Sequence, residues 1–183
     1  MSHLWINTGD LNDSVIYGAQ ILLTDLALKT YSSLKVYPRG SIIIAMYGAT
    51  IGKVGVLGVE ACVNQACCVL GGARKHVTKY TYYWFIAHRK AIVSLSYGGG
   101  QPNISQHTIR ALKMTVPPFT EQEAIVAYIE CETAKLDTLL AKYQRELELL
   151  EEYRASLISH AVTGKIDVRG LAEAAQPEFA EAL

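Results

Sequence analysis

Residues 47–55, with the sequence YGATIGKVG, contain glycines and a lysine that could bind a nucleotide phosphate. A phosphate-binding loop of that kind needs two glycines separated by four residues, then a lysine and a hydroxyl side chain for Mg²⁺. Here three residues separate Gly48 from Gly52, and Val54 occupies the place of the hydroxyl. We therefore expect a glycine turn between two strands and no nucleotide hydrolysis.

Other arrangements that could catalyse a reaction are incomplete. Amino-methyltransferases acting on DNA have Asp or Asn before a Pro-Pro-aromatic segment, whereas Val116 precedes Pro117, Pro118 and Phe119. The five histidines accompany no serine elbow and no HExxH motif. Residues 1–120 contain four acidic residues, which is few for a Mg²⁺-dependent nuclease. We predict no catalytic residues.

The cysteines do not predict a metal site. They are Cys62, Cys67, Cys68 and Cys131, which form no CxxC pair and have no histidine at finger-like spacing. We expect reduced, buried thiols, no metal and no cofactor. The longest apolar run, residues 42–47, is far shorter than the ~20 residues of a membrane helix, and no secretory signal is visible, so we expect a cytoplasmic protein with no membrane contact.

The zero net charge of the chain hides a strong asymmetry. Residues 1–120 carry 11 Lys and Arg against 4 Asp and Glu, giving 11 − 4 = +7. Residues 121–183 carry 6 against 13, giving 6 − 13 = −7. The first part is suited to a polyanion such as double-stranded DNA, and the second to a different partner.

Basic, aromatic and amide side chains in the first part match the groups that contact DNA phosphates and base edges. The residues expected near DNA are Tyr47, Thr50, Lys53, Gln101, Asn103 and Ser105, with Arg74, Lys75, Arg89 and Lys90 as phosphate contacts. The alternative for each charged residue is an ordinary solvated position, and for each tyrosine it is packing in the core.

The elements around these residues indicate an α+β (mixed α/β) domain over residues 1–118. Residues 35–48 and 53–64 read as strands around glycine turns. Residues 78–100 read as one helix ended by Gly98 to Gly100, and residues 109–119 read as a closing strand.

A long coiled-coil-type helix is predicted over residues 119–163, followed by a tail at 164–183. Thr120 and Glu123 form a capping box, and Gly164 suits a C-cap. Apolar residues alternate at spacings of three and four, as a and d positions of five heptads. The expected interface residues are Val126, Ile129, Leu136, Leu140, Tyr143, Leu147, Leu150, Arg154 and Leu157, with Thr133 and Ala161 in the same register.

The charges beside this seam favour an antiparallel partner. The flanking positions are mostly acidic, so two parallel copies would oppose like charges. An antiparallel pair centred near Lys142 brings Arg154 opposite Glu130 and Glu132. The alternative is a helix packed on its own domain with a solvated acidic face.

Several segments together resemble the DNA-specificity subunit of type I restriction–modification systems. They are WINTGDL, GSIIIAMYGATIGKVGVL, VNQACCVL, GGGQPNIS, IRALKMTVPPFTEQEAIVAYIE and ELELLEEYRASLISHAVTGKIDVRG. The resemblance covers most of residues 4–170, and the order of the segments makes it specific. It implies target-recognition domains that each read half of a split DNA target, separated by antiparallel helices.

The resemblance also implies a subunit without catalysis. S-adenosylmethionine, ATP and Mg²⁺ are expected on partner modification and nuclease subunits. Because this chain has one recognition domain and one spacer helix, it resembles a half-subunit, most like the C-terminal half, with a domain shortened at its N-terminus. Pairing with a copy would restore the two-domain arrangement. The alternative is a structural half-subunit that dimerises or caps a modification subunit without binding DNA.

Overall fold

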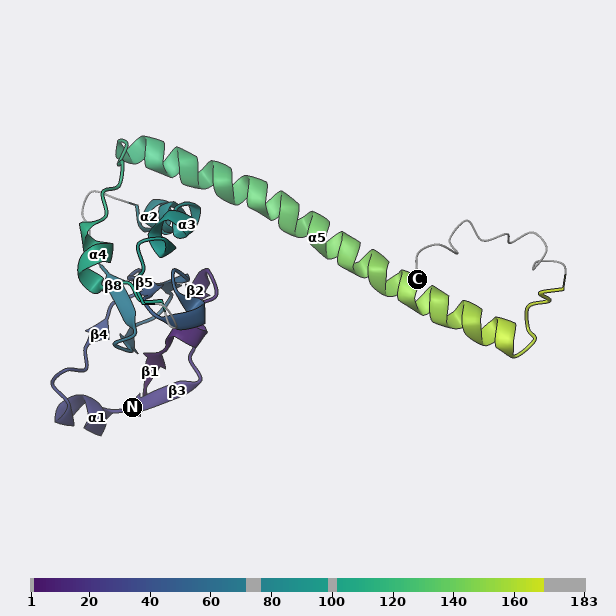
Figure 1. The fold of residues 1–183 in the computed structure, drawn as a ribbon, viewed down its shortest axis with the longest axis horizontal. Helices are drawn as coiled ribbons and strands as arrows, with labels where there is room; N and C mark the ends of the chain where they lie inside the picture. Colours follow the sequence, from purple (N-terminus) through teal and green to yellow (C-terminus); the bar gives the residue numbers. More distant parts are fainter. Residues whose placement is uncertain (1, 72–76, 99–101, 170–183) are drawn as a thin grey trace. The chain divides into compact units, whose positions relative to one another are not determined.

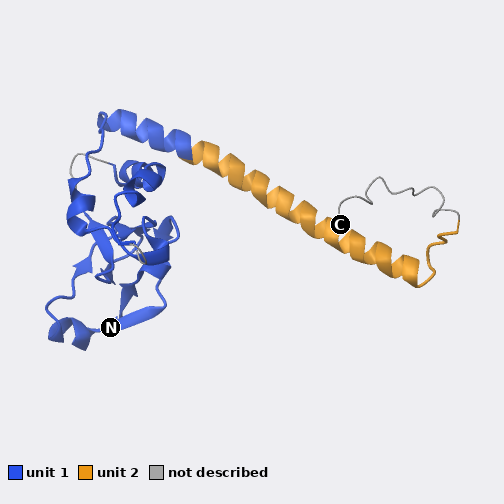
Figure 2. Cartoon of the chain, viewed as in Figure 1, with its two compact units in different colours: residues 1–129 blue, residues 130–183 orange. Residues whose placement is uncertain are grey.

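The computed structural model describes residues 2–71, 77–98 and 102–169, and it divides into two compact units (Figure 2). Unit 1, residues 1–129, holds two sheets, the short helices and the first turns of a long helix (Figure 1). Unit 2, residues 130–183, holds the remainder of that helix. The expected mixed domain followed by one long helix is confirmed.

Two four-stranded sheets form the body of unit 1. The first has the order β3-β1-β7-β4, with β1 (Ser2–Ile6), β3 (Ile21–Thr24), β4 (Val36–Tyr37) and β7 (Ala61–Val63). The second has the order β2-β6-β5-β8, with β2 (Ser14–Ile16), β5 (Ile42–Ala45), β6 (Val54–Leu57) and β8 (Cys67–Leu70). β1 pairs parallel with β7 and β2 with β6, and the other pairs are antiparallel. The ranges 35–48 and 53–64 therefore each contain two strands.

Strand β5 lies between two hydrophobic clusters, which explains its uninterrupted apolar sequence. Ile42 and Ile44 join the cluster formed with helices α2 (Thr78–Ala87), α3 (Arg89–Val93) and α4 (Gln106–Ala111). Ile43 and Ala45 point into the cluster between the two sheets. The same alternation places Cys67 in the second cluster and Cys68 in the first.

The single helix expected over residues 78–100 is wrong. The chain forms α2 and α3, separated at His88, where ψ is 8° instead of helical. The His88 ring stacks on Trp84 with centroids 4.2 Å apart, and its Nδ1 lies 2.9 Å from the Trp84 carbonyl oxygen. The His88 backbone N–H also donates to the Trp84 carbonyl, at 3.0 Å, so the ring and the backbone share that acceptor. Helix α3 ends at Val93, before Gly98, and residues 99–100 lie outside the described part.

The closing strand expected at residues 109–119 is also wrong. Ser105 caps helix α4 by accepting a hydrogen bond from the Thr108 N–H at 3.0 Å, so α4 occupies the start of that range. The described residues 112–118 contain no strand. Pro117 and Pro118 lack the N–H that a sheet ladder needs, which disfavours one there.

Helix α5 runs over Phe119–Val162, and its first turns pack within unit 1. The N–H groups of Glu121 and Gln122 both donate to the Pro118 carbonyl, so the helix begins earlier than the expected capping box at Thr120. The end matches the expectation. Gly164 has φ +72° and donates to Ala161, while the next N–H donates to His160, which is a Schellman motif.

Two further expectations concern burial. Cys62, Cys67 and Cys68 are buried thiols as expected, whereas Cys131 is exposed on α5. Among the described helices, α5 included, we find none whose apolar stretch would reach across a bilayer.

Candidate nucleic-acid interface

The YGATIGKVG segment forms the turn between the antiparallel strands β5 and β6, as expected. A 3₁₀ turn at Gly48–Thr50 is followed by Gly52, and both glycines have positive φ, at 63° and 76°. A Cβ on Gly52 would lie 2.8 Å from Val93 Cγ2, so this position needs glycine for space as well as conformation. The turn therefore packs directly against helix α3.

The turn lies beside the second segment expected near DNA. Tyr47 forms an isolated antiparallel bridge with Asn103, and the Gly48 N–H donates to the Pro102 carbonyl at 3.1 Å. The Ile104 N–H donates to the Met46 carbonyl at 2.9 Å. Side chains more than fifty residues apart in the sequence are thus brought to one place by backbone hydrogen bonds.

The polar side chains of this region differ in what they contact. Tyr47 is exposed, Thr50 and Lys53 are partly buried, and the Thr50 hydroxyl donates to the Tyr47 carbonyl at 3.3 Å. The Asn103 Oδ1 atom is buried and has no hydrogen-bond partner among the described residues. Ser105 is occupied as the cap of α4. Gln101 lies outside the described residues.

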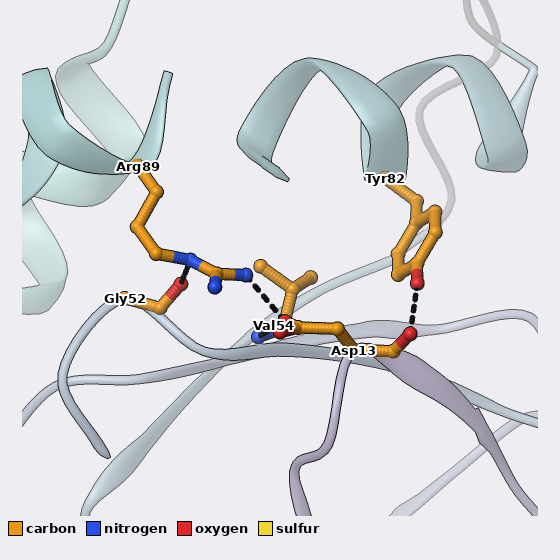
Figure 3. A network of polar contacts seen from close by, with 5 residues as sticks. All are labelled: Asp13, Gly52, Val54, Tyr82 and Arg89. Atoms are coloured by element: carbon orange, nitrogen blue, oxygen red, sulfur yellow. Dashed lines mark hydrogen bonds and ion pairs between the residues drawn. The ribbon is translucent and has the colours of Figure 1, made fainter. Parts of the chain in front are cut away.

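The basic residues also separate into two kinds. Lys90 is exposed on α3. Arg89 is tied into the domain, because its Nε donates to the Gly52 carbonyl at 3.0 Å and its Nη2 bonds the Asp13 carboxylate (Figure 3). Arg74 and Lys75 lie outside the described residues. Contact of any of these side chains with DNA stays a prediction.

Asp13 is the residue that sequence reasoning missed. Its Oδ1 accepts from Arg89 and from the Val54 N–H at 3.1 Å, and its carbonyl accepts from the Tyr82 hydroxyl (Figure 3). Burial, with the Asp13 charge second, raises the pKa of Tyr82. Asp13 has φ +55°, which Asp tolerates better than most residues. Its partners are 41, 69 and 76 positions away, so no local signal reveals it.

Unit 1 also contains a cavity of about 500 Å³ beside strands β5 and β8. Its lining residues include the apolar side chains of Ile42, Trp84 and Phe85 together with the basic side chain of Arg110. Among the described residues, no three histidine, cysteine or acidic side chains converge to hold a metal ion.

In unit 2, α5 displays a continuous apolar stripe to solvent. Its members, with exposed fractions between 46% and 65%, are Leu136, Leu140, Tyr143, Leu147, Leu150 and Leu157. Arg154 is exposed in the same register, whereas Val126 is buried and Ile129 partly buried within unit 1. Soluble helices rarely expose such a stripe unless another helix covers it.

A sequence model described as "Type I restriction modification DNA specificity domain" matches residues 4–149, which include both sheets, apart from the first two residues of β1, and most of the stripe. This chain belongs to that family. The chain is 28% identical over 146 residues to the type I restriction enzyme EcoKI specificity subunit of Escherichia coli K12, covering 73% of this chain and 30% of that protein. It is 23% identical over 143 residues to the putative MjaX specificity subunit of Methanocaldococcus jannaschii, covering 78% and 32%.

Two solved structures share the fold of this specificity domain. One comes from work on complex assembly and conformational transition of the type I R-M system. It gives a TM-score of 0.64 at 18% sequence identity, covering 82% of this chain and 36% of that one. The other, the HsdS subunit from Thermoanaerobacter tengcongensis, gives 0.58 at 16%, covering 75% and 31%. The chain thus spans about a third of the length of the relatives it matches.

Proposed function

We propose that this specificity domain recognises one half of a split double-stranded DNA target and assembles through α5 with modification subunits. The convergence of the β5–β6 turn with the segment around Asn103 supports DNA recognition most directly, because it gathers lysine, tyrosine and amide side chains. The +7 charge of residues 1–120 supplies the general attraction to phosphates.

The candidate contacts divide by chemistry. Lys53 and Lys90 supply charge for backbone phosphates, as Arg74 and Lys75 would. The Asn103 amide, like that of Gln101, can bond an adenine edge in the major groove. The Asn103 Oδ1 atom is buried in the free chain and has no partner among the described residues, so this contact requires the side chain to turn outward on binding.

Assembly would use the exposed stripe of α5. We infer an antiparallel pair of two copies centred near Lys142, which covers the stripe and places Arg154 opposite Glu130 and Glu132. Modification subunits would contact the acidic faces beside it. Lys142→Cys in a Cys131→Ser background should be cross-linked into a dimer by a flexible bismaleimide, because position 142 lies near the centre of the pair but beside the seam, where a direct disulfide would not close. Failure to cross-link, with a monomer in light scattering, would refute the pairing.

The proposed role involves no reaction on this chain. S-adenosylmethionine, ATP and Mg²⁺ would bind to partner modification and nuclease subunits, and the chain would act in the cytoplasm where its DNA lies. A structural half-subunit that caps a modification subunit without touching DNA is the second candidate. It is favoured by the stripe, which serves assembly whether or not DNA is bound.

Duplex binding across a salt series, with and without a modification subunit, separates the two candidates. Recognition predicts sequence-preferring binding that weakens steeply with salt, since each phosphate contact contributes a slope of about −0.9. Lys53→Gln should reduce that slope by about one. Stable assembly with a modification subunit but no DNA affinity at any salt concentration would support the structural candidate.

A further inference from the structure

The Asp13–Arg89 ion pair brackets a single residue of the β5–β6 turn. Arg89 Nε donates to the carbonyl of Gly52, and Asp13 Oδ1 accepts from the N–H of Val54, so the two members hold the residues on either side of Lys53 (Figure 3). The pair itself is closed by Arg89 Nη2 on the same Asp13 oxygen. Both side chains are 31% exposed, so the pair lies at the surface but is not fully solvated.

All four polar groups of the peptide units flanking Lys53 are therefore bonded. Besides the two bonds from the ion pair, the Lys53 N–H donates to the Thr50 carbonyl at 2.9 Å. The Lys53 carbonyl accepts from the Ala45 N–H, also at 2.9 Å. Fixing both peptide planes fixes the φ and ψ of Lys53, and hence the direction in which its side chain leaves the backbone.

Helix α3 supplies the rigid support for this arrangement. Arg89 is its first residue, and Val93 from the same helix lies 2.8 Å from the position of a Cβ on Gly52. The Arg89 side chain therefore reaches the turn, where Nε bonds Gly52, while Nη2 bonds Asp13 just before strand β2. A guanidinium can serve two acceptors at once through separate nitrogens, whereas a lysine has a single nitrogen.

We propose that Asp13 and Arg89 are positioning residues for DNA recognition, which act by fixing the backbone of Lys53 rather than by touching DNA themselves. This inference rests on the proposed recognition function for its effect on DNA. The geometric part, that the ion pair orders the turn, is independent of DNA. The assignment differs from the sequence-based expectation that Arg89 is a phosphate contact.

Two conservative variants distinguish a purely electrostatic role of Asp13 and Arg89 from a role in fixing the backbone of Lys53, because the two roles predict different DNA binding. Asp13→Asn removes a negative charge, so charge alone predicts equal or tighter binding to any duplex, whereas positioning predicts loss of sequence preference. Arg89→Lys keeps the charge, so a phosphate contact would survive, but a single ammonium nitrogen cannot occupy both the Nε and the Nη2 positions that reach Gly52 and Asp13. Asn tolerates the positive φ of residue 13, so neither change strains the backbone.

The first measurement is amide hydrogen exchange of the free chain. We expect the Val54 amide to exchange about tenfold faster in Asp13→Asn and Arg89→Lys, because a hydrogen bond to a charged group is weakened. The Ile43 and Ile44 amides of β5 should keep their protection, which shows that the domain is folded. The matched control is Asp25→Asn, which removes an equal charge from the His3–Asp25 pair and should leave Val54 unchanged.

The second measurement compares affinities for two DNA probes. One is the duplex that the wild-type chain enriches from a random-sequence library in the presence of a modification subunit, and the other is poly(dI-dC). We expect both variants to lower the ratio of these affinities about tenfold, with Asp13→Asn binding poly(dI-dC) at least as tightly as wild type. Asp25→Asn should keep the wild-type ratio.

The outcomes distinguish this inference from the proposed function. If the wild-type chain enriches no duplex, the recognition function fails, while Val54 exchange still decides whether the ion pair orders the turn. Unchanged Val54 exchange in both variants would overturn the positioning role. A wild-type affinity ratio in Arg89→Lys would overturn its link to recognition.

Discussion

Replacing Gly52 with alanine tests whether the β5–β6 turn is held against helix α3. Gly52 has φ +76°, and forcing alanine into that region costs roughly 1–2 kcal/mol. The added Cβ would also lie 2.8 Å from Val93 Cγ2 and 3.2 Å from Arg89 Cγ, and such overpacking adds about 1–3 kcal/mol. We therefore expect Gly52→Ala to lower the free energy of unfolding by about 2–5 kcal/mol.

Gly40 provides the matched control in the same unit. Its φ is +84°, but a Cβ there would meet nothing within 4 Å, so Gly40→Ala carries the conformational cost without the steric one. Urea unfolding followed by tryptophan fluorescence suits the comparison, because Trp5 and Trp84 both lie in unit 1. The two variants should differ by about 1–3 kcal/mol, the overpacking cost alone.

A double substitution sharpens the assignment. Val93→Ala removes the methyl group nearest to the new Cβ, so the pair Gly52→Ala with Val93→Ala should be less destabilised than the sum of the single changes by about 1 kcal/mol. Equal destabilisation by Gly52→Ala and Gly40→Ala would refute the reasoning. So would strict additivity of the Gly52 and Val93 changes.

Three further predictions concern other parts of the chain. Gln122 is fully buried and joins the Val77 N–H to the Pro117 carbonyl, so Gln122→Ala should cost about 1–3 kcal/mol in urea unfolding while the exposed neighbour Glu121→Ala changes little. Leu147→Lys on the exposed stripe should abolish self-association in light scattering without lowering the stability of unit 1. Glu152→Lys, outside the seam, should leave the dimer intact. A dimer that survives Leu147→Lys would contradict the assignment of the stripe as the dimer interface. Burial raises the pKa of Cys67 to about 12 from 9.0, so above about pH 9 this thiol is deprotonated in the unfolded chain but still protonated in the folded chain. The free energy of unfolding should therefore fall by ~1.4 kcal/mol per pH unit above about pH 9. Urea unfolding of Cys67→Ala should show a flatter dependence on pH. A pH slope unchanged by Cys67→Ala would count against that burial.

Short-range sequence patterns were sufficient to predict one strand, the long helix and the end of that helix. The run around Ile43 predicted a strand, the heptad spacing predicted α5, and Gly164 predicted where that helix ends. The failures occurred where a few local contacts outweigh propensity over a long segment. At His88, whose ring stacks on Trp84, the expected single helix is divided into α2 and α3, and the Ser105 cap starts a helix where a strand was expected.

The candidate site shows the same division. The side-chain types of Tyr47 and Asn103 predict contact with DNA, and the structure places the two residues together through backbone pairing that composition alone does not encode. The charge of Arg89 predicts a phosphate contact, yet its partner Asp13 lies 76 positions away and has a positive φ. A single sequence shows which residue types are available for a binding surface. The pairing of side chains that are 76 positions apart becomes visible only in the folded chain.

The distribution of the cysteines makes distance measurement on α5 possible without further engineering. Cys62, Cys67 and Cys68 are buried, so a spin label should attach at Cys131, on the face of the helix away from the stripe. In an antiparallel pair centred on Lys142, two such labels would be separated by roughly 33 Å along the axis, whereas parallel helices would hold them within about 20 Å. Pulsed dipolar spectroscopy resolves that difference, and a shift of one heptad in register would move the longer distance by roughly 10 Å.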